Sequence, residues 1–275
     1  MQFKTVLAIV GATDADADIG KAIELAAEQE AHLSIIVAGL ALPPSAGDFP
    51  STVWLDQRYE DLKILDDTKR KAETACAASG LSFDVDELYT EAGILSGEIF
   101  RRALYADLVF IAGGVRGDRE LTRAVLDGSV FDARRPLLVA PEKGNASLRP
   151  QRVLLAWNSR VEAARAAREA LDVLVSAGTV NIVIVDPDSS YWENGGEPGA
   201  DVAVHLARHG VNVVVEQLAS GGRPIEDVLQ RHALESGCDM IVMGAYGHSR
   251  LRERIFGGVT ASILKDCAVP VFLAR

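Results

Sequence analysis

The sequence predicts an α/β protein of two tandem doubly wound domains, each with a five-stranded parallel sheet and helices on both faces. Three observations carry this prediction. Short, fully apolar runs of strand length alternate with segments whose apolar residues recur every three or four positions. Many of the apolar runs end at glycine or at a polar turn. The whole series of elements then occurs a second time, and alternation of this kind is typical of parallel sheets covered by helices.

The first half contains five predicted strands and four predicted helices. Its opening run, Thr5-Val-Leu-Ala-Ile-Val10, is apolar throughout, which is typical of a strand buried on both faces. The segment 39–50 is rich in Pro, Gly, Ser and Ala and predicts a loop. We expect the strands at 5–10, 33–37, 83–88, 108–111 and 137–140, and the helices at 19–30, 55–78, 93–105 and 121–131.

The second half repeats this order after a polar segment, residues 141–150, whose Gly and Pro content is typical of a linker. A last helix is predicted after Gly258, where Val259, Ile263 and Leu264 are spaced for packing. We expect strands at 153–157, 180–185, 211–217, 240–243 and 269–274, and helices at 160–174, 201–209 and 225–234. The predicted domains are therefore 1–141 and 152–275, joined by a linker at 142–151.

The two halves share residues as well as the order of their elements. Asp107 and Asp239 each precede a run of four apolar residues, and Pro136 and Pro270 each precede the last apolar run of their half. Such self-similarity is the sequence signature of a repeated structural unit. We interpret the chain as a duplicated domain.

The composition is that of an ordinary globular protein, with 48% apolar and 24% charged residues. The formal net charge of -11 argues against nucleic acid and membrane partners, because both attract basic surfaces. No apolar run approaches the roughly 18 to 20 residues needed to span a bilayer, and the chain starts directly with a strand. We therefore expect a cytoplasmic protein, with its three cysteines buried and reduced.

The most informative stretch follows the fourth predicted strand of the second half. There the chain passes from Met243 to Gly244 and Gly247, and it reaches Gly257 and Gly258 before the next helix. Glycine lets the backbone approach a ligand closely, and the free N–H groups at a helix start favour an anion. Ligands in such folds bind outside the carboxyl ends of the strands. The stretch therefore predicts a phosphate-binding loop, with a plain glycine-rich turn as the alternative.

The spacing Gly244-x2-Gly247-x9-Gly257 resembles the nucleotide-binding signature of the universal stress protein family, and the element order of both halves is similar to that family's domain. The resemblance implies ATP or a related adenine nucleotide, with or without Mg2+, as the ligand. It also implies a role in stress response through ligand-dependent interactions with an unknown protein partner. The two copies are expected to pack as a pseudo-dimer within the chain, and a homodimer of the chain stays open.

The resemblance also assigns roles to single residues. Members that bind nucleotide contact the nucleoside with an Asp after the first strand, and Asn158 stands at or beside that position; a helix N-cap is its alternative role. Trp157 either flanks the purine or packs, and His248 either contacts phosphate or is exposed. The nucleotide-binding residues predicted in this way are Ala156, Trp157, Asn158, Ile184, Met243, Gly244, Gly247, His248, Gly257, Gly258, Val259 and Thr260.

Each half departs from the family pattern at a different point. Gly258 stands where the family usually has Ser or Thr, which removes a hydroxyl that helps to hold phosphate, and Thr260 is a candidate replacement. The first half has Gly114 and Gly117 followed after ten residues by Gly128-Ser129, which keeps the serine but is one residue too long. A displaced helix start loses its aligned N–H donors. We therefore expect the ligand in the second half and a degenerate site in the first.

The sequence gives no reason to assign catalysis, since it contains neither a Walker sequence nor a nucleophile elbow. Slow ATP hydrolysis stays open. The alternative function is a member that binds no nucleotide and acts as an interaction or chaperone-like scaffold, which is motivated by Gly258. His205 and His209 lie one helical turn apart, and we interpret them as an exposed helix face because a zinc site needs further ligands.

Overall fold

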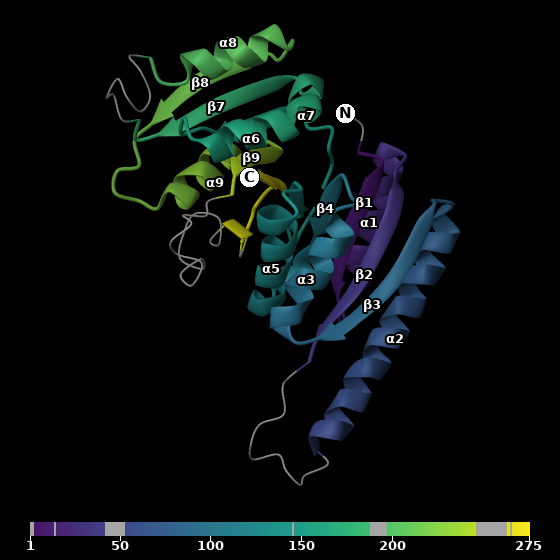
Figure 1. The fold of residues 1–275 in the computed structure, drawn as a ribbon. Coiled ribbons are helices and arrows are strands. Elements are labelled where there is room, and N and C mark those ends of the chain that lie inside the picture. The colour runs from purple at the N-terminus through teal and green to yellow at the C-terminus, as the bar shows by residue number, and fades with distance from the viewer. Residues whose placement is uncertain are drawn as a thin grey trace. The chain divides into compact units, whose positions relative to one another are not determined.

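The computed structural model describes residues 3–13, 15–41, 53–144, 146–187, 197–245, 263–264 and 266–275. The described residues fall into two compact units, residues 3–135 and residues 136–275 (Figure 1). Both units combine parallel strands with helices, so the predicted α/β class is confirmed.

Unit 3–135 contains four strands that pair in parallel in the order β3-β2-β1-β4. The strands are β1 (Thr5–Gly11), β2 (His32–Leu40), β3 (Phe83–Thr90) and β4 (Leu108–Ile111). The central strand β1 is buried as its apolar run predicts, because Val6 to Val10 are each at most 1% exposed. The helical elements are α1 (Asp16–Gln29), α2 (Val53–Ser79), α3 (Ala92–Ala103), α4 (Gly113–Arg116), α5 (Arg119–Val125) and the π-helix η1 (Leu126–Asp132).

The helices of this unit form two groups. Helix α1 packs against α2, and α2 runs along β3 (Figure 1). Helix α3 packs against α5 and η1. Right-handed crossovers place α1 and α2 on one face of the sheet and α3 and α5 on the other, because the chain reverses its direction across the sheet between β3 and β4.

Unit 136–275 contains six strands in the order β5-β10-β9-β6-β7-β8. They are β5 (Leu137–Val139), β6 (Arg152–Ala156), β7 (Thr179–Val185), β8 (Val213–Leu218), β9 (Met240–Gly244) and β10 (Val271–Ala274). Strand β5, the last strand of the first sequence repeat, pairs antiparallel with β10, and the pairs that involve β6, β7, β8 and β9 are parallel. The helices are α6 (Val161–Glu169), α7 (Leu171–Ser176), α8 (Ala200–Arg208) and α9 (Ile225–Glu235).

The two repeated aspartates make the same contact in the two units. Asp107 accepts hydrogen bonds from the backbone N–H groups of Lys4 at 2.8 Å and Thr5 at 3.0 Å, at the start of β1. Asp239 accepts from the N–H groups of Gln151 and Arg152, both at 2.9 Å, at the start of β6. A carboxylate before one strand thus satisfies the free donors at the start of the neighbouring strand.

Some helix boundaries differ from the sequence prediction. The helix expected at 121–131 is divided into α5 and the π-helix η1. The helix expected at 160–174 is divided at Ala170, whose φ of -87° and ψ of 5° interrupt the helix. The glycine loop after β4 contains an additional short helix, α4. Apolar spacing indicates a helix but does not show where its turns widen or break.

The burial of the cysteines agrees with the expectation from composition. Cys76, Cys238 and Cys267 are buried and form no disulfide. Burial raises the pKa of the Cys76 thiol, and it raises the pKa of Cys238 to about 11, so both thiols stay protonated at neutral pH. Within the described parts of the chain, no helix is long and apolar enough to cross a membrane.

Candidate functional site

The carboxyl ends of β6 and β9 lie side by side in unit 136–275. Strand β6 pairs with β9 on one side and with β7 on the other, and β9 also pairs with β10. The chain continues from β6 to β7 and β8 in one direction across the sheet, and from β9 to β10 in the other. The strand order therefore reverses between β6 and β9, which is the position where open α/β sheets bind their ligands.

Three of the predicted residues follow or end β6 at this position. Ala156, Trp157 and Asn158 are all half-buried. The backbone N–H of Trp157 donates to the carbonyl oxygen of Val183 at 2.9 Å, which fixes the direction in which the chain leaves the sheet. Asn158 Oδ1 accepts from the N–H of Arg160 at 3.2 Å. Arg160 is the N-cap of α6, so the expected alternative role of Asn158 as the N-cap is wrong. Asn158 shapes the turn before the helix instead.

Gly244, at the end of β9, is explained by helix packing. A Cβ atom there would lie 2.6 Å from the carbonyl carbon of Glu162 and 2.8 Å from the backbone nitrogen of Ala163. Glycine thus lets the first turn of α6 approach the end of β9. Met243 is buried, and the N–H of Ala245 donates to the carbonyl oxygen of Ala274 at 2.8 Å. The first amide after Gly244 is therefore used within the protein.

The remaining predicted residues divide into one core residue and a group outside the described residues. Ile184 is 2% exposed in β7, so its side chain belongs to the core and only its backbone could face a ligand. Asp186, which follows β7, stabilises a turn: its carboxylate accepts from the N–H of Ser220 at 2.9 Å. Hydrogen bonds from Ser220 hold the pKa of Asp186 below its usual range. Outside the described residues lie Gly247, His248, Gly257, Gly258, Val259 and Thr260.

The corresponding position of unit 3–135 lies between β1 and β4, and it contains a carboxylate that the sequence analysis missed. Asp18, the third residue of α1, is only 4% exposed. Its Oδ2 atom accepts from the backbone N–H of Gly114, in the glycine loop after β4, at 2.8 Å. Burial raises the pKa of Asp18, and the hydrogen bond from Gly114 opposes this effect without cancelling it. The Gly114 amide, at the glycine position where the family pattern would place a bound anion, is thus bonded to the side chain of Asp18.

The second glycine position of unit 3–135 is also used for packing. A Cβ on Gly128 would collide with the carbonyl oxygen of Ser96 and would lie 3.0 Å from the backbone nitrogen of Phe100, both in α3. Ser129 is fully buried, and its hydroxyl donates to the carbonyl oxygen of Val125 at 2.5 Å. The serine that matches the family pattern therefore bonds to the last residue of the preceding helix, α5.

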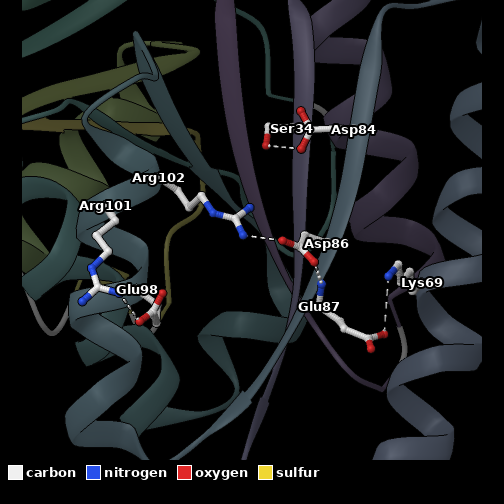
Figure 2. Close-up of polar contacts among 8 residues, drawn as sticks. All are labelled: Ser34, Lys69, Asp84, Asp86, Glu87, Glu98, Arg101 and Arg102. Carbon is white, nitrogen blue, oxygen red and sulfur yellow. Dashed lines mark hydrogen bonds and ion pairs between the residues drawn. The ribbon is translucent and has the colours of Figure 1, made fainter.

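Charged side chains along β3 are paired within unit 3–135. Figure 2 shows Asp86 directed to Arg102 of α3 and Glu87 directed to Lys69 of α2, on opposite faces of the strand. The hydrogen bond from Arg102 lowers the pKa of Asp86. Asp84 accepts from the hydroxyl of Ser34 at 2.9 Å. These contacts hold helices against an edge of the sheet, so we assign them a structural role.

The histidine pair on α8 lies on the surface. His205 and His209 are exposed, with ring centroids 5.0 Å apart. In the described ranges, no group of three or more His, Cys, Asp or Glu side chains is arranged to hold a metal ion.

Comparisons with known proteins agree with this architecture. Residues 150–275 match the family model described as the universal stress protein family. The universal stress protein Slr1230 of Synechocystis is 33% identical over 70 residues, which is 26% of this chain and 23% of that protein. The match thus spans under a quarter of the curated relative's length.

Solved structures show the same fold over almost the whole chain. A universal stress protein from Archaeoglobus fulgidus has a TM-score of 0.65 at 20% identity, with 98% of each chain covered. A Pseudomonas aeruginosa protein of unknown function has a TM-score of 0.56 at 13% identity, with 99% of this chain and 92% of that chain covered. The parallel strands, the covering helices and the switch point define a doubly wound α/β fold. Residues 150–275 are the part of this chain that matches the universal stress protein family.

Proposed function

We propose that the chain binds an adenine nucleotide, ATP or a relative, in unit 136–275 and acts in stress response through interactions that depend on the bound ligand. The observation that carries this proposal is that Asn158 follows β6 and Gly244 ends β9, the two paired strands on either side of the switch point. The family match covers the same part of the chain.

The residues around the switch point suit a nucleoside. Asn158 uses Oδ1 in its turn, and its amide NH2 group can donate to a ribose or base acceptor. The half-buried indole of Trp157 offers an apolar surface beside it. The phosphates would be held by backbone donors from Gly247 to Thr260, because the amide of Ala245 is already bonded to Ala274.

The proposal extends to the organisation of the chain. We infer two domains, residues 1–141 and 152–275, that arose by duplication and are joined by the segment 142–151. The shared contacts of Asp107 and Asp239 support the duplication. The antiparallel pairing of β5 with β10 supports association of the two copies through their last strands. A protein partner would then bind differently to the second domain with and without its nucleotide.

ATP with Mg2+ should stabilise the full chain against heat. At a ligand concentration of about 100 times Kd, binding adds about 2.7 kcal/mol, which raises Tm by about 5 °C or more for a domain of this size. The measurement is a thermal shift together with mass spectrometry of small molecules released from protein purified directly from cells.

A variant pair controls for nonspecific effects. Gly257→Trp should abolish the shift by filling the phosphate position, whereas Gln217→Trp, on the exposed side of β8, should leave it intact. Absence of both co-purified nucleotide and thermal shift would contradict nucleotide binding. It would favour the scaffold function that Gly258 motivates.

A further inference from the structure

Asp18 stands out as a buried carboxylate that no function assigned above requires. We propose that Asp18 is an internal anion that closes the ligand end of unit 3–135, so that this unit excludes nucleotide and each chain holds one nucleotide, in unit 136–275. The count of one rests on the proposed function, whereas the closure by Asp18 rests only on contacts within unit 3–135.

The backbone at Gly114 lies in close contact with the carboxylate of Asp18. A Cβ on Gly114 would lie 2.9 Å from Asp18 Oδ2, so the side chain reaches the loop only because position 114 is glycine. A Cβ on Gly11, at the end of β1, would lie 3.6 Å from the carbonyl oxygen of Gly114. The ends of β1 and of the loop after β4 are therefore in close contact. The Gly114 amide, which a phosphate would need as a donor, is already bonded to the carboxylate of Asp18.

Helix α2 reinforces this closure. The hydroxyl of Thr68 donates to the carbonyl oxygen of Ala12, just after β1, at 2.8 Å, and Thr68 is 7% exposed. Burial raises the pKa of Asp18, and the positive charges of Lys21 and Arg116 act in the opposite direction. An incoming phosphate would meet a buried carboxylate that already accepts from the Gly114 amide, and its approach to the ionised form of that carboxylate is unfavourable because like charges repel.

Unit 136–275 differs at the equivalent place. The third residue of α6 is Ala163, which is buried against Gly244 as Asp18 is against Gly114. Alanine supplies no carboxylate there. The carboxylate of the preceding residue, Glu162, makes no hydrogen bond to any residue that the structure describes. The chain thus carries an internal anion in one repeat, and the other repeat lacks the residue that supplies it.

The second glycine position of unit 3–135, Gly128, gives a further reason to infer that this unit excludes nucleotide. Gly128 packs on α3, and the hydroxyl of Ser129 bonds to Val125, so the second glycine position of unit 3–135 is also used for contacts within the protein. Ligand binding there would need both internal contacts to break. Nucleotide occupancy is therefore a property of unit 136–275 alone.

Hydrogen exchange on the full chain, with and without ATP and Mg2+, tests this inference. In the wild type, nucleotide should slow exchange in peptides from 150–275 and leave residues 108–132 unchanged. Asp18→Ala should speed exchange of the Gly114 amide by about tenfold, because it removes a buried acceptor. Asp18→Asn should preserve protection through its amide oxygen. Asp16→Ala, which removes an exposed carboxylate from the same helical turn, should change nothing.

The outcomes separate the two claims. Nucleotide-dependent protection of 108–132, or unchanged Gly114 exchange in Asp18→Ala, would overturn the closure by Asp18. Absence of nucleotide protection anywhere in the chain would contradict the proposed function, and Gly114 exchange in Asp18→Ala would still decide the closure. The wild-type comparison needs no variant, so it decides the exclusion of nucleotide from unit 3–135 even if Asp18→Ala fails to fold.

Discussion

Replacing Gly128 with alanine should destabilise unit 3–135 by about 3 kcal/mol, the upper part of the range for overpacking. The new methyl group would collide with the carbonyl oxygen of Ser96 and would approach Phe100 N to 3.0 Å and Ile99 Cβ to 3.1 Å. Two of these three atoms are backbone atoms of α3, which cannot rotate away as a side chain can. Urea-induced unfolding of the full chain measures the loss as a lower midpoint for this unit.

Gly97→Ala is the matched control, because it adds the same methyl group to α3 itself. Gly97 is exposed, and a Cβ there would meet nothing within 4 Å. Alanine is favoured over glycine inside a helix, so this variant should be neutral or more stable by about 0.4–1 kcal/mol. Equal midpoints for Gly128→Ala and the wild type would show that α3 does not contact η1 as described.

Ala163→Asp should lower nucleotide affinity by about tenfold or more. It places a carboxylate at the third position of α6, beside Gly244, and so gives unit 136–275 the feature that Asp18 gives to unit 3–135. A like charge facing the phosphates costs at least about 1.4 kcal/mol, which corresponds to that factor. Isothermal titration with ATP and Mg2+ measures the change.

Ala163→Asn separates charge from size in this test. Asparagine has nearly the same shape as aspartate and carries no charge, so it should retain most of the affinity. Circular dichroism should show that both variants are folded, because Ala163 is only 3% exposed and either substitution adds volume. Wild-type affinity in a folded Ala163→Asp protein would show that the phosphates bind elsewhere.

The fold could be predicted from the sequence because its strands are buried on both faces. A run such as Val6 to Val10 has no polar position, and only the interior of a sheet covered by helices accommodates it. The partners of β5 could not be predicted. Its apolar run fits any buried position, and pairing with β10 depends on contacts more than 130 residues away in the chain.

The candidate site could be predicted only in part. Glycine spacing directs attention to the ends of β4 and β9, but it does not separate close packing from ligand approach. Gly128 and Gly244 both prove to accommodate helix backbone. Asp18 was missed because its partner, Gly114, lies 96 residues away. A signal was present: Asp18 stands one helical turn before Ala22, on the buried face of α1.

Photolabelling of the full chain with an azido-adenine nucleotide, followed by peptide mapping, tests the central claim most directly. We expect one label per chain, located in peptides from 150–275 and close to Trp157 and Asn158 after β6. Excess ATP should prevent the labelling. A label in residues 3–135, or labelling that ATP does not reduce, would contradict nucleotide binding at the switch point between β6 and β9.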